Sequence, residues 1–441
     1  MLVAVWLAPL AAVAAEPASQ PPPSTPAPTD VGVAETRAPV ASAPTFAATS
    51  AGHASDYRIS GYVQGQYESH QDSQNQLRQD GQLLNQNRFL VRRARLRVER
   101  ENDYAGFRIE LDGNTTNGPG FGLRSAYGSL FYRGSDDPTK VPWIQASIGL
   151  FDTPFGFELV ESPRTRHFME RSIGSRAFFP GEPDVGVRLS GGFAFLRYAF
   201  AVLNGQPLDE KGGYPGRDPN SQKDLVLRLG FEERASSALR VAGGVSVLRG
   251  KGFHAGTPAT KNTLAWKDLN EDGQVQPSEI TAVPGSAATP SQNFDRWAVG
   301  ADLQLRVTTP IGETQLFAEL VVAQNLDRGL YVADPIATSI DVRHRSYYVG
   351  ITQEVTPYGL IGFRTEFYDP NADAQDKQLG KLSPFTQRIR VYSPLVGLVL
   401  PHRAKLLFQA DFISDFFAKD ALGVPTDLHN DQATVRLQVE L

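Results

Sequence analysis

The chain contains many segments of about ten residues in which apolar and polar side chains alternate. In WAVGADLQLRV (297–307), every second residue from Trp297 to Val307 is apolar, and AKLLFQADF (404–412) alternates in the same way. A period of two is typical of a β-strand whose two faces meet different surroundings. From Tyr57 onward, no stretch approaches the roughly 20 consecutive apolar residues that a membrane-spanning helix requires. The expected fold class is therefore all-β.

About 16 such segments follow one another, and the connections between them alternate in length. The segments begin near residues 58, 88, 105, 122, 143, 184, 194, 222, 238, 294, 313, 345, 358, 387, 402 and 431. The connections after the odd-numbered segments are long, namely 68–87, 113–121, 152–183, 204–221, 251–293, 326–344, 370–386 and 414–430. Those after even-numbered segments, such as 100–104 and 309–312, are short. This alternation predicts a transmembrane antiparallel β-barrel with long external loops and short periplasmic turns.

Closure of the sheet has a physical reason, because hydrocarbon cannot satisfy backbone N–H and C=O groups at an open edge. A soluble β-sandwich is the alternative, but it gives no reason for every second loop to be long. Aromatic residues near segment ends, where a membrane interface would lie, favour the membrane barrel. These residues are Trp143, Trp297, Phe367 and Phe412.

The N-terminal residues have a different composition from the rest of the chain. Residues 2–15 (LVAVWLAPLAAVAA) form an apolar run that ends in small residues, which is typical of a secretory signal peptide over 1–15. Residues 16–56 are rich in proline and alanine and are expected to form a disordered periplasmic linker before the barrel at 57–441. The 441 residues include no cysteine, which excludes disulfides and thiolate metal sites. The net charge of −5 does not indicate nucleic-acid binding. A signal peptide followed by a transmembrane barrel predicts a location in the bacterial outer membrane.

Arginines recur on the polar side of the predicted strands. In LVRRARLRV (90–98), Leu90, Leu96 and Val98 are expected to face lipid, so the alternating arginines face water. Arg92 fits neither face and is expected to snorkel or to mark a β-bulge. The same alternation predicts arginines along the lumen at Arg93, Arg95, Arg97, Arg108, Arg188, Arg228, Arg306, Arg364, Arg390 and Arg436.

Two interpretations of these lumen arginines remain open. Guanidinium groups keep their charge and match oxyanions, so a row of them could pass anions through a channel. Alternatively, cross-strand ion pairs with carboxylates on the same side could simply solvate the wall. The carboxylates on that side are Glu110, Asp112, Asp302, Glu319, Glu366 and Asp411.

Several stretches resemble the phosphate-selective porin O/P family, and the similarity runs in order over about residues 58–441. They are ISGYVQGQYE (59–68), FLVRRARLRVE (89–99), IGLFDTPFGFE (148–158), DVGVRLSGG (184–192), YAFAVLNG (198–205) and the closing VRLQVEL. The resemblance implies a sixteen-stranded homotrimeric porin in outer-membrane lipid. It also implies that the third long loop, here 152–183, folds into the lumen and narrows it.

The predicted constriction loop carries charges of both signs. Its cationic side chains would raise the local concentration of anions. The alternative is that Glu158, Glu161 and Glu170 neutralise them. The basic residues are Arg164, Arg166, His167, Arg171 and Arg176.

The long external loop 251–293 contains DLNEDGQVQPSE (268–279), which has the spacing of an EF-hand calcium loop. Gly273 occupies the turn position, although the flanking helices of an EF-hand are missing. The expected role of Ca²⁺ is structural, because a bound ion would rigidify a long exposed loop. A polar surface loop in which these residues only build turns is the alternative. The predicted ligands are Asp268, Asn270, Asp272, Gln274, Gln276 and Glu279.

The expected function is a passive, water-filled outer-membrane channel for small anions such as phosphate. A general diffusion porin without phosphate selectivity, and a barrel-anchored structural or adhesive surface protein, are the alternatives. An enzyme is not expected, since no Ser/His pair and no carboxylate constellation stands out among the seven histidines.

Overall fold

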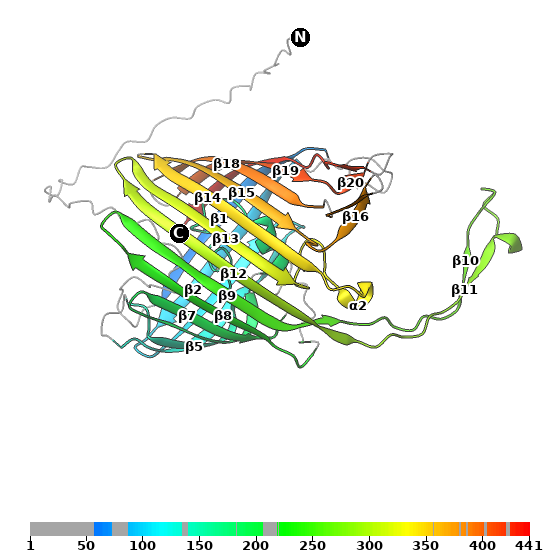
Figure 1. The fold of residues 1–441 in the computed structure, drawn as a ribbon, viewed down its shortest axis with the longest axis horizontal. Helices are drawn as coiled ribbons and strands as arrows, with labels where there is room; N and C mark the ends of the chain where they lie inside the picture. Colours follow the sequence, from blue (N-terminus) through cyan, green and yellow to red (C-terminus); the bar gives the residue numbers. More distant parts are fainter. Residues whose placement is uncertain are drawn as a thin grey trace, which may run out of the picture. The chain divides into compact units, whose positions relative to one another are not determined.

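The fold is a closed barrel of sixteen antiparallel strands (Figure 1). The structure, a computed structural model, describes residues 57–72, 87–134, 140–181, 183–205, 218, 220–355, 357–378, 381–384, 387–400, 404–419 and 424–441. The predicted signal peptide (1–15) and linker (16–56) lie outside the described residues. The barrel strands are β1 (Arg58–His70), β2 (Arg88–Glu101), β3 (Ala105–Asn114), β4 (Gly120–Tyr132), β5 (Ile144–Asp152), β6 (Pro183–Phe193), β7 (Leu196–Leu203), β8 (Asp224–Arg234), β9 (Leu239–His254), β12 (Gln292–Thr309), β13 (Gly312–Gln324), β14 (Arg343–Val355), β15 (Gly359–Asp369), β18 (Ile389–Leu400), β19 (Ala404–Asp415) and β22 (Gln432–Glu440).

Each barrel strand pairs with its neighbour in the chain, and β1 closes the sheet by pairing with β22. The closing ladder runs from Tyr62 opposite Glu440 to His70 opposite Gln432. The predicted all-β barrel and its strand count are therefore confirmed. Among the described residues, no helix is long and apolar enough to cross a membrane.

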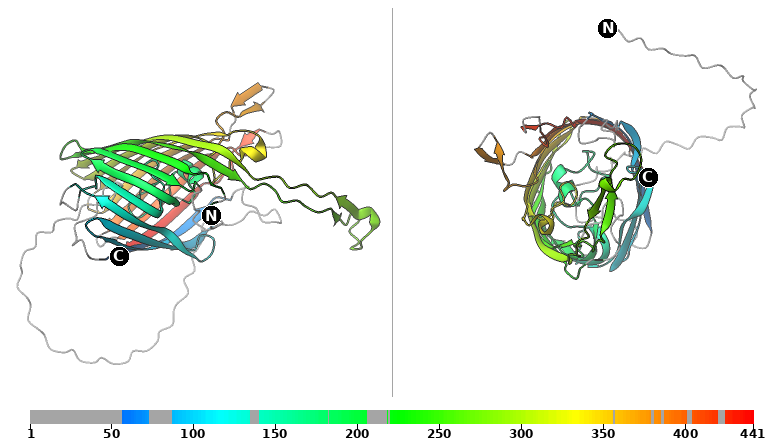
Figure 2. Two further views of the ribbon diagram at one scale, coloured as in Figure 1. Left: turned by 90° about the horizontal axis from the view of Figure 1, so that it is seen from below. Right: turned by 90° about the vertical axis from the view of Figure 1, so that its right-hand side faces the viewer.

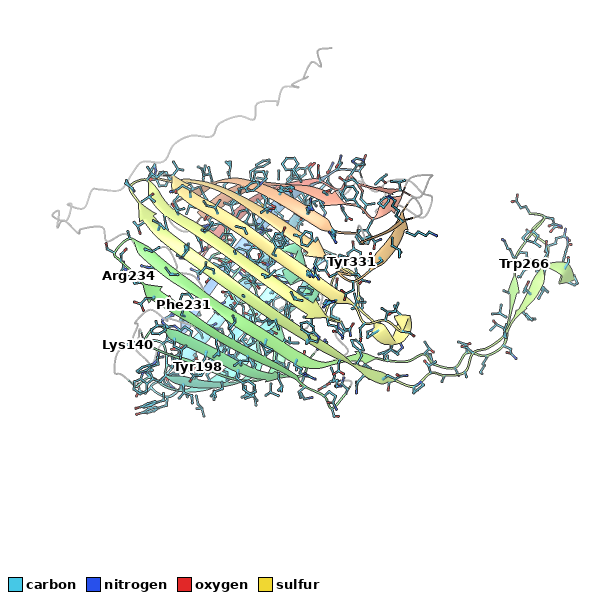
Figure 3. The ribbon with its side chains drawn as sticks, viewed as in Figure 1. Lys140, Tyr198, Phe231, Arg234, Trp266 and Tyr331 are labelled. Carbon is cyan, nitrogen blue, oxygen red and sulfur yellow. The ribbon has the colours of Figure 1, made fainter. Side chains whose placement is uncertain are left out.

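The outer face of the barrel is apolar, as the alternation predicts. On β12, the outward side chains of Val299 and Leu303 are 48% and 44% exposed, whereas the inward Asp302 and Gln304 are buried. Near one end of the barrel, Trp143 packs edge-on against Tyr132 and Phe193, with ring centroids 6.1 and 5.6 Å apart. Figure 3 places Arg234 and Lys140 at the end that carries the short connections. An apolar band with aromatic side chains near its border suits a wall in contact with lipid.

Two β-bulges interrupt the strand ladders, and the extra residue in each is an arginine. Between β1 and β2, Gln64 pairs with Arg93 and Gly65 with Val91, so Arg92 is left over. Between β3 and β4, the residue left over is Arg124. The bulge predicted at Arg92 is confirmed.

The bulge at Arg92 corrects one expectation about the strand's faces. Leu90 lies inside the barrel and is 7% exposed, whereas the adjacent Phe89 faces outward and is 85% exposed. A single extra residue reverses the side on which every following side chain lies. The alternation that places Leu96 on the lipid face therefore does not extend to Leu90.

The long loops contain small elements of their own. The loop between β9 and β12 holds the hairpin of β10 (Thr263–Trp266) and β11 (Ile280–Val283), with the 3₁₀ helix η1 (Pro277–Glu279) between them. Trp266 lies in this hairpin (Figure 3). The other elements are α1 (Ile173–Phe178), α2 (Pro335–Thr338), and the hairpins β16 (Gln375–Gln378) with β17 (Lys381–Pro384) and β20 (Ala418–Lys419) with β21 (Pro425–Thr426).

Candidate functional site in the barrel lumen

The loop between β5 and β6 folds into the barrel, as expected for the third long loop. The right-hand view of Figure 2 shows α1 inside the ring of strands. Phe155 and Phe178 of the loop are 1% exposed and pack against inward residues of the wall such as Ala298. A second cluster joins Phe168 to wall residues of β13 to β19. Burial of these aromatic side chains supplies the main attraction that holds the loop inside.

The loop backbone donates hydrogen bonds to carboxylates of the wall. The N–H groups of Phe157 and Glu158 donate to Oε2 of Glu319 at 3.0 and 3.1 Å. The N–H group of Ile173 donates to Oε2 of Glu366 at 2.7 Å. Hydrogen bonds to a charged acceptor are about twice as strong as neutral ones, so these contacts fix the loop on the acidic strands β13 and β15.

Glu170 of the loop binds three wall arginines. Its carboxylate lies 3.0 Å from Arg92, 3.0 Å from Arg93 and 2.6 Å from Arg436. Glu158 forms a similar pair with Arg364 at 3.1 Å, and its carboxylate also accepts the backbone N–H of Ser172. The loop glutamates therefore neutralise wall arginines more than they neutralise arginines of the loop.

The four predicted constriction arginines have different environments. Arg164 pairs with Glu440 of β22 at 2.7 Å. Arg166 is buried, with its Nε 3.6 Å from Glu161. Arg171 is buried and donates to the carbonyl oxygen of Phe179 at 2.9 Å. Arg176 is exposed, and among the described residues no carboxylate lies within 4.0 Å of it.

Nine of the ten predicted lumen arginines do face the interior of the barrel, and most of them are paired. Arg95 lies 3.1 Å from Asp112, Arg97 is 2.6 Å from Glu110, and Arg108 is 2.9 Å from Glu99. Between strands β8 and β13, Arg228 pairs with Asp302, and Arg306 approaches Glu313 at 3.6 Å. Cross-strand pairing thus accounts for most of the arginines, as the alternative interpretation proposed. The inward set is Arg93, Arg95, Arg97, Arg108, Arg188, Arg228, Arg306, Arg364 and Arg436.

Arg390 is the exception, because it lies on the outer face of β18. Its neighbours Ile389 and Val391 are buried inside, whereas Arg390 is exposed on the same side as Tyr392. The prediction for this strand placed the wrong set of alternate residues in the lumen. It was wrong because the inward positions near the start of the strand are apolar. They are apolar because they pack against the inward loop.

Arg296 is a lumen arginine that the sequence analysis missed. It is 1% exposed and lies 2.7 Å from Asp224 of β8. It shares the inward face with Ala298 and Asp302. The signal was present, because extending the alternation one residue before Trp297 would have included it.

Charge is unevenly divided around the lumen. From β2 to β6, inward arginines and carboxylates are about equal in number, whereas from β12 to β19 carboxylates outnumber basic residues. Arg97 and Arg108 keep 29% and 23% of their side-chain surface exposed. We call the β2–β6 side the basic wall; its arginines are Arg93, Arg95, Arg97, Arg108, Arg124 and Arg188, and its carboxylates are Glu99, Glu101, Glu110, Asp112, Asp152 and Asp184. The opposite acidic wall holds Asp302, Glu313, Glu319, Glu366, Asp411 and Asp415, against Arg296, Arg306, Arg364 and Lys405.

Comparison with solved structures identifies the fold. The barrel superimposes on the anion-selective porin from Comamonas acidovorans with a TM-score of 0.52 and 12% identity, covering 88% of this chain and 99% of that one. It also matches the outer membrane channel DcaP of Acinetobacter baumannii (TM-score 0.51, 11% identity, 90% and 100% covered) and OprB of Pseudomonas putida (0.51, 12%, 87% and 94%).

The chain has the fold of an outer-membrane porin. No protein-family model matches the sequence, and no curated protein matches it. The closed barrel with its apolar outer face and porin fold lies in the bacterial outer membrane. At these identities the comparison establishes the fold alone.

The predicted calcium loop forms a compact turn in the hairpin of β10 and β11. The carboxylate of Asp268 accepts the N–H groups of Asp272 and Gly273 at 3.2 and 2.7 Å. Glu279 is turned toward the indole of Trp266, 3.1 Å away, and this hydrogen bond lowers the pKa of its carboxyl group. In the described part of the chain, no three acidic or histidine side chains converge closely enough to hold a metal ion. Binding would therefore require Glu279 to leave Trp266.

Proposed function

We propose that the barrel is a passive, water-filled channel for small anions. The observation that carries this proposal is the division of charge in the lumen. The loop covers the acidic wall, and its backbone N–H groups bind Glu319 and Glu366. The basic wall keeps exposed guanidinium groups, such as those of Arg97 and Arg108. Anions in the lumen would therefore meet partly exposed guanidinium groups rather than the carboxylates that the loop covers, which raises their local concentration.

The anion-selective porin of similar fold is in keeping with this proposal. Phosphate itself has less support than small anions as a class. A phosphate dianion would be held best by several unpaired cations, whereas most guanidinium groups of the basic wall already contact a carboxylate. A general diffusion porin with a weak anion preference is thus the milder form of the same function. The homotrimer implied by the family resemblance is proposed with it, and gel filtration in detergent tests that assembly.

Measurement of reversal potential in planar bilayers under a KCl gradient tests the proposed selectivity. The expected sign is that of a channel more permeable to chloride than to potassium. The double variant R97E/R108E should reduce or reverse the preference, because both changes invert charge on the open side of the lumen. R390E is the matched control, since Arg390 lies on the outer face. Cation preference in the unmodified protein would refute the proposal, and a barrel without conductance would favour a surface anchor.

We further propose that calcium braces the external loop 251–293. Its support is the spacing of Asp268, Asn270, Asp272, Gln274, Gln276 and Glu279, with Gly273 in a left-handed turn at φ +72°. Because a two-stranded hairpin is marginally stable alone, an ion that joins its two ends would protect it from cleavage.

Limited proteolysis of the folded barrel tests this brace. Calcium should slow cleavage within 251–293, magnesium should not, and D268N/E279Q should abolish the calcium effect. Equal cleavage with calcium and with chelator would reject the site.

A further inference from the structure

Arg188 differs from the other arginines of the basic wall because it has no carboxylate partner. Its neighbours across the strands are Ser147 and Ala201, which carry no charge. No described group accepts a hydrogen bond from its guanidinium, and its Nε is buried without a partner. The side chain itself is only half-buried. The two terminal nitrogens are thus left to water in the lumen.

Aromatic rings hold the guanidinium in place. Its central carbon lies 4.7 Å from the ring centroid of Phe151 and 5.5 Å from that of Tyr127. These two rings meet edge to face, with centroids 6.2 Å apart. Gly149 lies beside them at φ +134°, and a Cβ there would come within 2.8 Å of the Tyr127 Cα. Because aromatic rings pack against the guanidinium of Arg188, its N–H edge is the part that remains to bind a ligand.

The uncompensated positive charge at Arg188 suits a ligand that carries a single negative charge. Arg108, which also lies over the Tyr127 ring at 5.7 Å, is paired with Glu99 at 2.9 Å. Arg124 is paired with Asp152 at 2.6 Å. Arg188 therefore contributes the one uncompensated positive charge of this group of described residues. A planar carboxylate matches two parallel N–H donors, and the half-buried Tyr127 ring favours a flat apolar body behind it.

We propose that Arg188 and Tyr127 form a binding site for monocarboxylates with a flat, apolar body, and that the buried ring of Phe151 supports the guanidinium from within the wall. This inference rests on the proposed channel function and narrows its substrate class. The carboxylate would bind the terminal nitrogens of Arg188, and the apolar body would lie against the half-buried ring of Tyr127. A dianion such as phosphate would leave one negative charge without a partner and would bind less tightly.

Isothermal titration of the detergent-solubilised, full-length barrel tests the site without requiring conduction. Benzoate is the probe, and acetate and inorganic phosphate are the comparisons. Benzoate is expected to bind more tightly than either. R188Q and R188K should each weaken benzoate binding by about tenfold, because lysine keeps the charge but lacks the planar pair of donors.

R390Q is the matched control, since it removes an arginine from the outer face and should leave benzoate binding unchanged. Heat-modifiable migration on gels verifies that each variant is folded, and R188K serves if R188Q does not fold. Benzoate affinity equal in R188K and the unmodified barrel, or phosphate binding tighter than benzoate, would overturn the site. Chloride current measured in parallel separates the two proposals, because its absence counts against the channel and leaves the binding result intact.

Discussion

Glu170 brings together three arginines from two strands that are far apart in the chain. Arg92 and Arg93 come from β2 and Arg436 from β22, and all three lie within 3.0 Å of its carboxylate. The side chain of Glu170 is 25% exposed, so water screens the group only partly. Removing one charge from such a group leaves like charges close together in a region of low dielectric.

Substituting Glu170 by glutamine should loosen the loop inside the barrel. The amide keeps the size but lacks the charge, so the free energy of unfolding should fall by about 3 kcal/mol, as for other broken buried pairs. Urea titration in detergent micelles measures the loss. E161Q is the comparison, because the ion pair of Glu161 with Arg166 is longer, at 3.6 Å, and its loss should have a smaller effect. Equal losses in the two variants would show that Glu170 does not anchor the loop.

At the scale of elements, the β-bulges connect the wall to the inward loop. Each bulge directs an arginine to a carboxylate in or next to the inward loop. Arg92 pairs with Glu170 of the loop, and Arg124 pairs with Asp152, the last residue of β5. Regular alternation would have placed these arginines on the lipid face, where a charge is costly. The sequence indicated the bulge at Arg92, because the position fitted neither face. It did not indicate the one at Arg124.

Deletion of Arg92 should leave the two faces of β2 unchanged. With Val91 joined directly to Arg93, Leu90 stays inward and Phe89 stays outward, and the strand alternates regularly. The deletion and R92Q both lose the ion pair with Glu170. The yield of heat-modifiable barrel after refolding in detergent should therefore be similar for the two variants. A much lower yield for the deletion would indicate that the strand requires the bulge itself.

At the scale of the whole molecule, the proposed anion selectivity would arise from the two walls and the loop together. The loop binds the acidic wall through backbone N–H groups and leaves Arg97 and Arg108 of the basic wall partly open to water. Neither wall is selective by itself, because each holds residues of both signs. The net preference depends on which charges remain accessible after the loop has folded inward.

This origin of selectivity predicts a dependence on salt. The Debye length falls from about 10 Å at 0.1 M to about 3 Å at 1 M, so charges on the wall act over a shorter distance at high salt. The preference for chloride over potassium should decrease steadily as ionic strength rises. Reversal potentials at a fixed concentration ratio measure it. A preference that stays constant would indicate selection by direct contact at one site rather than by the field of the basic wall.

The strand number, the loop lengths and the facing of most arginines were determined by the sequence alone. Alternation of side chains is a local property of an extended chain, so it can be recognised without knowing which strands are neighbours. Arg390 shows the limit of this reasoning: apolar residues can also face the lumen where the loop covers them. The side on which a residue lies then no longer follows from its polarity.

The pairing of the charges was decided only by the tertiary structure. Arg436 and Glu170 are 266 residues apart in the chain, and no local pattern relates them. The same holds for Arg188, whose lack of a carboxylate partner depends on Ser147 and Ala201 lying opposite it. A charge in the lumen attracts an ion only as far as its neighbours leave it uncompensated, and those neighbours come from closure of the barrel and from the path of the loop within it.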